Sequence, residues 1–328
     1  MPNVRQPRSG TMGVWPRKRA ARQYPAIRGW AKSNEKKLLG FAGYKVGMTH
    51  VLHADNVKTS KTKGEEIFSA VTVVECPALK VIGIKTYENT SYGLKPKTQI
   101  NAKTIDKEIV ERKLTKPKKH NEEKISSLKT DDFDKMVVVV ATQPKLIGLK
   151  KRPEIFEIAL GGSKDDQLAF AKEKLGKEVS VKEVFGEGNQ VDIHAVTKGH
   201  GIQGPIRRFG IGRRRHKSEK AIRNPGSLSA WKSQGHTQYR VAHAGQTGYH
   251  TRTEYNKQIL KIGDKPEEIN VKGGYLHYGN VKNTYVIIRG SINGPNKRLI
   301  RFNAATRPNA KITKEAPQIT YISLNSKQ

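Results

Sequence analysis

The chain of 328 residues is poor in cysteine, in acidic side chains and in long apolar runs. Its single cysteine, Cys76, excludes an intramolecular disulfide and is typical of a reducing compartment. The absence of a run of about 18 apolar residues excludes a membrane-spanning helix. Hydrophobic residues make up 35% of the chain, which is sufficient for a modest core, and the length allows about two domains.

Familiar catalytic signatures are also missing. The sequence contains no G-x-S-x-G, H-E-x-x-H or P-loop motif, so it offers no sign of the hydrolases and nucleotide-binding enzymes that carry them. Cys76 stands in a strand-like pattern, where a buried structural thiol is the usual interpretation. Asp192, close in sequence to a basic stretch, is the candidate acid–base group, and a structural role is favoured for it over catalysis. We therefore expect a protein that is not an enzyme.

The scarcity of acid leaves a large positive charge. There are 62 Lys and Arg residues against 29 Asp and Glu, giving a formal net charge of +33. Such a surplus repels itself unless a polyanion neutralises it, and nucleic acid is the usual polyanion in cells. An anionic membrane surface is the alternative, but the sequence shows neither a basic amphipathic helix nor a lipidation signal.

The charge is concentrated in two stretches. Residues 1–34 contain eight Lys or Arg and no acid, and residues 198–257 contain thirteen against two acids. Residues 101–190, with nineteen basic and sixteen acidic side chains, have the balance of an ordinary soluble domain. An Arg-rich, acid-free start also resembles a transit peptide, but frequent Pro and Gly would break its amphipathic helix.

The two basic stretches contain too little apolar surface to fold alone, so a disordered tail and a floppy loop are one interpretation. Aromatic side chains are nevertheless interleaved with their arginines, which suits stacking on unpaired bases beside phosphate contacts. We therefore predict segments that become ordered on RNA. The aromatic residues concerned are Trp15, Tyr24, Trp30, Phe209, Trp231, Tyr239 and Tyr249.

Two further patterns are candidates for a ligand-binding site. Residues 199–204, GHGIQG, match the dinucleotide-binding motif, but Pro205 and the glycines after it lead us to expect no helix there. Several histidines are close in sequence, yet their basic neighbours would repel a metal cation, so contacts with phosphate or bases are favoured. These histidines are His194, His200, His216, His236, His243 and His250. We expect no cofactor and no metal.

The remaining sequence is rich in predicted β-strands. Runs rich in β-branched residues, bounded by Gly, Pro or Asn, predict strands at 70–76, 81–84, 191–197, 284–289, 299–302 and 318–324. Residues 136–141 have the pattern of a buried strand, and 154–160 have an alternating pattern. A helix is predicted over 163–175 with Ser163 as its N-cap, and a second over 104–114. The pattern indicates mixed β and α/β structure, with an α/β module inserted into a β-barrel and long irregular basic extensions.

Four ordered stretches resemble the ribosomal protein L3 family in its archaeal form, and the resemblance covers nearly the whole chain. The longest is DIHAVTKGHGIQGPIRR at 192–208. The others are PRSGTMG with PRKRA at 7–20, GYKVGMTH at 43–50, and AHAGQTGYHTRTE at 242–254.

The resemblance implies a translation-factor-like β-barrel formed by residues 35–90, 191–197 and 258–328, with 91–190 as the inserted α/β domain. It also implies an N-terminal arm, residues 1–34, and an internal extension, residues 198–257, both entering large-subunit 23S rRNA. The extension would reach towards the peptidyl transferase centre, with Trp231 at its tip. His216 aligns with a histidine that is methylated in eukaryotic members, but its surroundings depart from the eukaryotic pattern.

The function implied is that of a cytoplasmic structural protein of the large subunit that acts early in assembly. Ribosomal proteins L-fourteen and L-twenty-four-e would be its neighbours, and neither a membrane nor a second copy of the chain is expected as a partner. An RNA-modifying enzyme and a general nucleic-acid chaperone are the alternatives. The predicted RNA-binding residues are Arg5, Arg8, Arg17, Lys18, Arg19, Arg22, Lys198, His200, Arg207, Arg208, Arg213, Arg214, Arg215, His216, Lys217, Lys220, Arg223, Trp231, Lys232, Arg240, His243, Gln246, His250 and Arg252.

Overall fold

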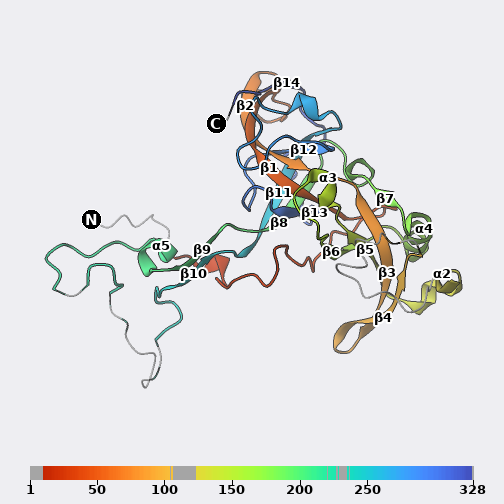
Figure 1. Ribbon diagram of the computed structural model, residues 1–328, viewed down its shortest axis with the longest axis horizontal. Helices are drawn as coiled ribbons and strands as arrows, with labels where there is room; N and C mark the ends of the chain where they lie inside the picture. Colours follow the sequence, from red (N-terminus) through yellow and green to blue (C-terminus); the bar gives the residue numbers. More distant parts are fainter. Residues whose placement is uncertain are drawn as a thin grey trace. The chain divides into compact units, whose positions relative to one another are not determined.

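The computed structural model describes residues 10–103, 105, 123–219, 221–226, 228, 235 and 237–326 (Figure 1). The chain divides into two compact units. Unit 1 contains residues 1–23 and 196–252, and unit 2 contains residues 24–195 and 253–328. In the described residues the secondary structure is mostly β-strand, with a few short helices.

The larger sheet has the strand order β13-β8-β11-β12-β2-β1-β14. Because β1 pairs with β13 as well as with β2, all its strands except β14 form a closed circuit of hydrogen-bonded neighbours. β14 pairs with β1 outside that circuit. The bounds are β1 Gly40–Ala54, β2 Glu66–Glu75, β8 Gln190–Val196, β11 Thr251–Gly263, β12 Tyr285–Arg289, β13 Leu299–Ala304 and β14 Ile319–Ile322.

A second sheet has the order β4-β3-β5-β6, with β7 also paired to β3. Its strands are β3 Leu79–Thr90, β4 Gly93–Asn101, β5 Lys135–Ala141, β6 Ile155–Ala159 and β7 Glu178–Val179. The helices of unit 2 are α2 Glu123–Ser127, α3 Pro144–Ile147 and α4 Lys164–Lys174. Short 3-10 turns in unit 2 are η2 Thr130–Asp132, η3 Val181–Glu183 and η4 Pro266–Glu268.

Alternate side chains of the circuit strands enter two different cores. On β12, Val286 and Ile288 belong to a large cluster shared with the second sheet, whereas Tyr285 and Ile287 belong to a smaller cluster. This follows from the two-residue repeat of a strand, which sends neighbouring side chains to opposite faces. Both faces of β12 are thus buried, which explains why its predicted run is almost continuously apolar.

A strand lies in each of the predicted ranges, although several strands begin or end one or two residues inside the predicted bounds. The helix prediction at 163–175 is confirmed as α4, where the Ser163 hydroxyl accepts a hydrogen bond from the Asp166 amide at 3.2 Å. The second predicted helix falls on residues 104–114, nearly all of which lie outside the described residues. The pattern missed β1, because glycines interrupt its apolar run. At Gly43 a Cβ would lie 2.4 Å from Cys76 Sγ, so only glycine fits there.

Residues 24–34 contradict the expectation that the whole N-terminal stretch becomes ordered only on RNA. Tyr24 and Trp30 pack against the large core cluster. The buried Arg301 guanidinium donates to the Pro25 carbonyl at 2.9 Å, and the Asn303 amide donates to the Gly29 carbonyl at 3.0 Å. These eleven residues therefore belong to the fold of unit 2, because backbone carbonyls and two rings supply contacts that a hydrophobic pattern does not reveal.

Two structural interpretations from the sequence are confirmed. Cys76 is a free, buried thiol, and burial raises the pKa of this thiol. The Asp192 carboxylate is buried and accepts hydrogen bonds from the Asn256 amide and from the Thr306 amide and hydroxyl. No helix among the described residues is long and apolar enough to cross a membrane.

Candidate nucleic-acid interface

Unit 1 contains a pair of antiparallel strands that are far apart in the sequence, and we call this pair the hairpin. β9, Gly199–Gln203, pairs antiparallel with β10, Gly245–Gly248. Gly248 has a φ of +70°, and a Cβ there would lie 2.0 Å from the Lys198 carbonyl oxygen. Glycine is required at this position because both the left-handed backbone and the close approach exclude a side chain.

A helix follows the hairpin strand directly, so the expectation that no helix begins after Gly204 is wrong. α5 spans Pro205–Phe209, with Gly204 as N-cap and Gly210 in the left-handed conformation as C-cap. Proline is compatible with the first helical position because its missing N–H would have no partner there anyway. The helix has only five residues and ends at Gly210, so it lacks the long helix that opens a dinucleotide-binding fold.

Residues 10–23 pack along the hairpin within unit 1. The Ala20 amide donates to the Tyr249 carbonyl at 2.8 Å, and the Arg252 guanidinium donates to the Val14 carbonyl at 2.9 Å. His250 Nδ1 lies 2.9 Å from the Lys18 carbonyl oxygen. The turn η1, Met12–Val14, precedes Trp15, whose ring meets Tyr239 edge-on at 5.8 Å. The arm and the extension, separate in the sequence, are one folded body here.

Phe209 is central to this body. It is only 8% exposed, and the guanidinium carbons of Arg17 and Arg208 lie 4.5 Å and 5.0 Å from the centre of its ring. Such cation–π contacts are stronger when they are removed from water. The prediction that Phe209 stacks on an RNA base is therefore wrong, because the ring is buried within unit 1 and already contacts both arginines.

Several predicted RNA-binding arginines turn inwards. The Arg17 guanidinium donates to the Arg208 carbonyl at 2.7 Å, and Arg208 Nε donates to the Gln246 carbonyl at 3.1 Å. Arg214 donates to the Pro225 carbonyl at 2.8 Å. We call the predicted residues that are not exposed the inner set: Arg17, Arg208, Arg214, Gln246, His250 and Arg252.

The inner set brings several positively charged side chains close together. Burial lowers the pKa of the Arg208 guanidinium, and the nearby Arg17 charge lowers this pKa further. The pKa of Arg252 is lowered for the same two reasons. Burial is also the main cause that lowers the pKa of His250, helped by the charges of the three arginines and opposed by its bond to the Lys18 carbonyl. Carbonyl dipoles hold these cations in place, but no full negative charge on this unit offsets them beyond that of Glu219.

A larger group of predicted residues is exposed, and we call it the outer set. Arg207 approaches Gln203 and His200 at 3.5 Å, and the Arg19 guanidinium lies 5.7 Å from the Tyr249 ring. The members are Lys18, Arg19, Arg22, Lys198, His200, Arg207, Arg213, Arg215, His216, Lys217, Arg223, Arg240 and His243. The predicted residues Arg5, Arg8, Lys220, Trp231 and Lys232 lie outside the described residues.

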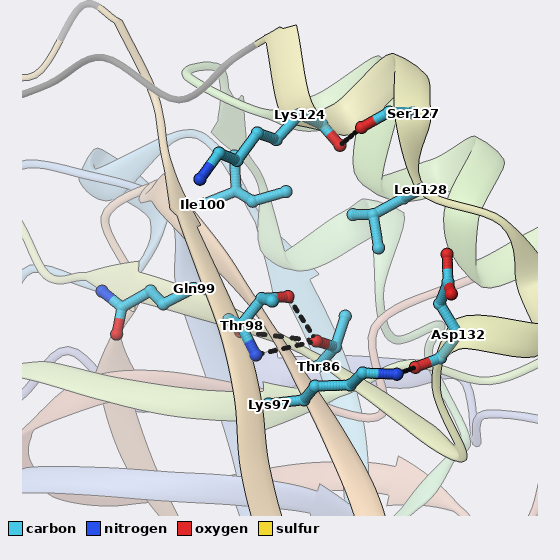
Figure 2. A pocket seen from close by; sticks show the side chains of 9 residues that line it. All are labelled: Thr86, Lys97, Thr98, Gln99, Ile100, Lys124, Ser127, Leu128 and Asp132. Atoms are coloured by element: carbon cyan, nitrogen blue, oxygen red, sulfur yellow. Dashed lines mark hydrogen bonds between the residues drawn. The ribbon is translucent and has the colours of Figure 1, made fainter.

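A pocket elsewhere in the chain contains none of these residues. It lies in unit 2 against β3 and β4 and has a volume of about 540 Å³ (Figure 2). Figure 2 shows the Lys97 ammonium donating to the Asp132 carbonyl, at 2.8 Å, along one wall. Within the described part of the chain, no group of three His, Cys, Asp or Glu side chains is placed to hold a metal ion.

Comparison with known proteins agrees with this geometry. The family model described as "Ribosomal protein L3" matches residues 1–328. The chain is 46% identical over 332 residues to the protein named "Large ribosomal subunit protein uL3" from Methanobrevibacter smithii, covering 98% of each chain. Proteins of the same name from Methanothermobacter thermautotrophicus and Archaeoglobus fulgidus are 46% and 43% identical, again over 98% of each chain. The chain belongs to the ribosomal protein L3 family.

Proposed function

We propose that this protein is a structural constituent of the large ribosomal subunit and that it binds 23S rRNA through unit 1. One observation supports this best: unit 1 gathers 18 Lys and Arg residues and a single acid into 80 residues, with the cations of the outer set exposed. An RNA backbone supplies the missing negative charge, since each neutralised phosphate releases a condensed counterion.

The inner and outer sets have different tasks in this proposal. The inner arginines donate to carbonyls of both segments and so fix the course of the backbone. The outer cations are therefore exposed to solvent on an ordered backbone. Less conformational entropy is then lost when they contact phosphates. The mutual repulsion of Arg17, Arg208 and Arg252 is relieved when RNA surrounds the unit.

The domain arrangement that the family resemblance implies is also part of this proposal. We propose that residues 35–90, 191–197 and 258–328 form a translation-factor-like β-barrel, with 91–190 as an inserted α/β domain, and the closed circuit of strands supports this. The extension, residues 198–257, reaches towards the peptidyl transferase centre with Trp231 at its tip. The protein binds early in assembly beside ribosomal proteins L-fourteen and L-twenty-four-e. Trp231→Ala should then leave incorporation into subunits normal but change peptidyl transfer or drug sensitivity.

Catalysis on RNA is the weaker proposal. Asp192 is engaged by three hydrogen bonds inside unit 2, so it is not positioned as an acid–base group for a substrate. A general chaperone would bind any duplex with similar affinity, whereas a subunit protein should select one rRNA domain.

The test combines location with selectivity. Tagged chain should sediment with large subunits in a sucrose gradient of cell lysate, and purified chain should prefer 23S rRNA fragments to an unrelated duplex. Binding should weaken by about 0.7–0.9 log units per phosphate contact for each log unit of salt. Absence from the subunit fraction, equal affinity for both RNAs, or a flat salt response would each contradict the proposal.

A further inference from the structure

Unit 2 carries an exposed aromatic patch on the outer face of three neighbouring strands. Leu52 of β1 is paired with Phe68 of β2 on one side and with Tyr321 of β14 on the other. His50, two residues earlier on β1, lies against both rings, with centroid distances of 4.9 Å to Phe68 and 6.5 Å to Tyr321. Met48 continues the same face of β1. We call Met48, His50, Leu52, Phe68 and Tyr321 the aromatic patch.

The patch contributes little to the cores of the unit. Phe68 is 64% exposed, Tyr321 46% and Met48 40%. The neighbouring residues on the opposite face, Val51 and Val71, are fully buried in the smaller core cluster. Burial of the exposed side would remove three large side chains from water, and contiguous apolar surface of this kind marks a binding site more often than scattered single residues do.

The chemistry of the patch differs from that of the RNA-binding surface in unit 1. Its five members include no Lys or Arg, in a chain with 62 of them. The charged side chain at the next position on the same face of β2 is Glu66, which is exposed and would repel a phosphate backbone. The His50 ring lies tilted by 34° against the Phe68 ring, so the two rings already contact each other on one side. Aromatic and Met side chains with little charge are typical of the centre of a protein–protein interface.

We propose that the aromatic patch docks the apolar face of another protein of the large subunit, one that places a basic side chain opposite Glu66. This inference rests on the proposed function. Phe68 and Tyr321, on either side of Leu52, are the anchors, and the short edge strand β14 holds the second of them. A basic rim on the partner suits Glu66, whereas a phosphate backbone would be repelled by this exposed carboxylate beside the rings.

Photo-cross-linking in assembled subunits tests the partner's class. A photoreactive phenylalanine derivative is placed at position 68 or, as a control, at position 92, where Tyr92 is fully exposed at the β3–β4 turn of the same unit. Subunits are isolated by gradient, irradiated and analysed by mass spectrometry. Position 68 should yield a peptide of one other subunit protein that position 92 does not yield. Cross-links to RNA, or none, would overturn the proposal.

A matched pair of substitutions that introduce a charge provides the second arm. Phe68→Asp should reduce the amount of that same protein retained on salt-washed subunits by about tenfold, as expected when an aromatic anchor is lost. Tyr92→Asp should leave retention unchanged. Melting of the free variants shows whether each still folds, and equal retention with a folded Phe68→Asp would contradict the inference. If neither variant enters large subunits while both fold, the proposed function fails instead.

Discussion

Units 1 and 2 carry nearly equal positive charge, although they differ greatly in their number of residues. Unit 1 has a surplus of 17 in 80 residues, whereas unit 2 has a surplus of 16 in 248 residues. Unit 2 balances 44 basic side chains with 28 acids, for example in the Lys85–Glu157 and Lys174–Glu183 pairs. Unit 1 has Glu219 as its only acid. Charge density, rather than total charge, therefore separates the RNA-binding surface from the supporting body.

The two units also differ in what holds them together. Among the described residues, the buried hydrophobic side chains of unit 1 are Val196 and Phe209, whereas unit 2 contains all the others. Unit 1 relies instead on guanidinium groups that donate to backbone carbonyls and stack on Phe209. A unit built in this way gains stability from a surrounding polyanion, and unit 2 does not depend on one.

The largest expected effect separates two deletions of the N-terminal stretch. Deleting residues 1–34 should lower the stability of unit 2 by on the order of 5 kcal/mol, because Arg301 and Asn303 lose buried acceptors and two rings are removed from the core. Deleting residues 1–23 should leave the melting of unit 2 unchanged. Calorimetry of both truncated proteins distinguishes them, and equal melting would mean that residues 24–34 contribute nothing.

A buried carboxylate should make unit 2 sensitive to a single substitution. Glu75 is fully buried and accepts hydrogen bonds from Tyr278 Oη at 2.7 Å, from the Lys282 amide at 3.0 Å and from the amide and side chain of Asn283. Glu75→Ala leaves these donors unsatisfied and should cost about 3 kcal/mol or more. Glu66→Ala, at the exposed start of the same strand, is the control. Urea unfolding with similar midpoints for the two variants would contradict this.

Phe209 gives the corresponding prediction for unit 1. Phe209→Ala should destabilise that unit by about 2–3 kcal/mol, because the two guanidinium groups lose the ring that both contact. Hydrogen exchange should accelerate at the Ala20 and Gly210 amides and remain slow in β2. Ile202→Ala, a substitution of an exposed side chain in β9, should leave both unchanged. Faster exchange in both units would show that they unfold as one.

Acid should weaken unit 2 through His194. Burial, assisted by the charge of Arg301, lowers the pKa of His194 from 6.5 to about 4. The unfolded chain therefore takes up a proton that the folded chain resists, so this contribution is complete above pH 6.5 and is lost as the pH falls towards 4. After allowance for partial exposure it amounts to about 2 kcal/mol. His194→Gln should flatten the pH dependence of unfolding, whereas exposed His200→Gln should not.

The sequence predicted the parts of this protein that depend on local pattern. Runs of β-branched residues located strands, and Ser163 with Asp166 located the start of α4. It could not predict α5, because Pro205 and the nearby glycines are residues that usually interrupt a helix. Proline is compatible with α5 because it occupies the first helical position. Nor could it divide the basic residues into two sets. Arg17 and its acceptor at Arg208 are 191 residues apart, and that acceptor is a carbonyl that every residue possesses.

The division between inner and outer cations gives the finest test of the comparison. Arg213→Gln, in the outer set, should leave hydrogen exchange in unit 1 unchanged and lower the salt slope of rRNA binding by about 0.7–0.9, the value of one phosphate contact. Arg252→Gln, in the inner set, removes a donor to the Val14 carbonyl, so the Ala20 amide should exchange faster. The rRNA affinity of Arg252→Gln should fall because residues 10–23 become less ordered. Its salt slope should change less than that of Arg213→Gln. Lys95→Gln on exposed β4 is the control and should alter neither measurement. If Arg213→Gln and Arg252→Gln change the slope equally and leave exchange untouched, the carbonyl contacts of Arg252 do not order the arm, and both arginines act directly on RNA.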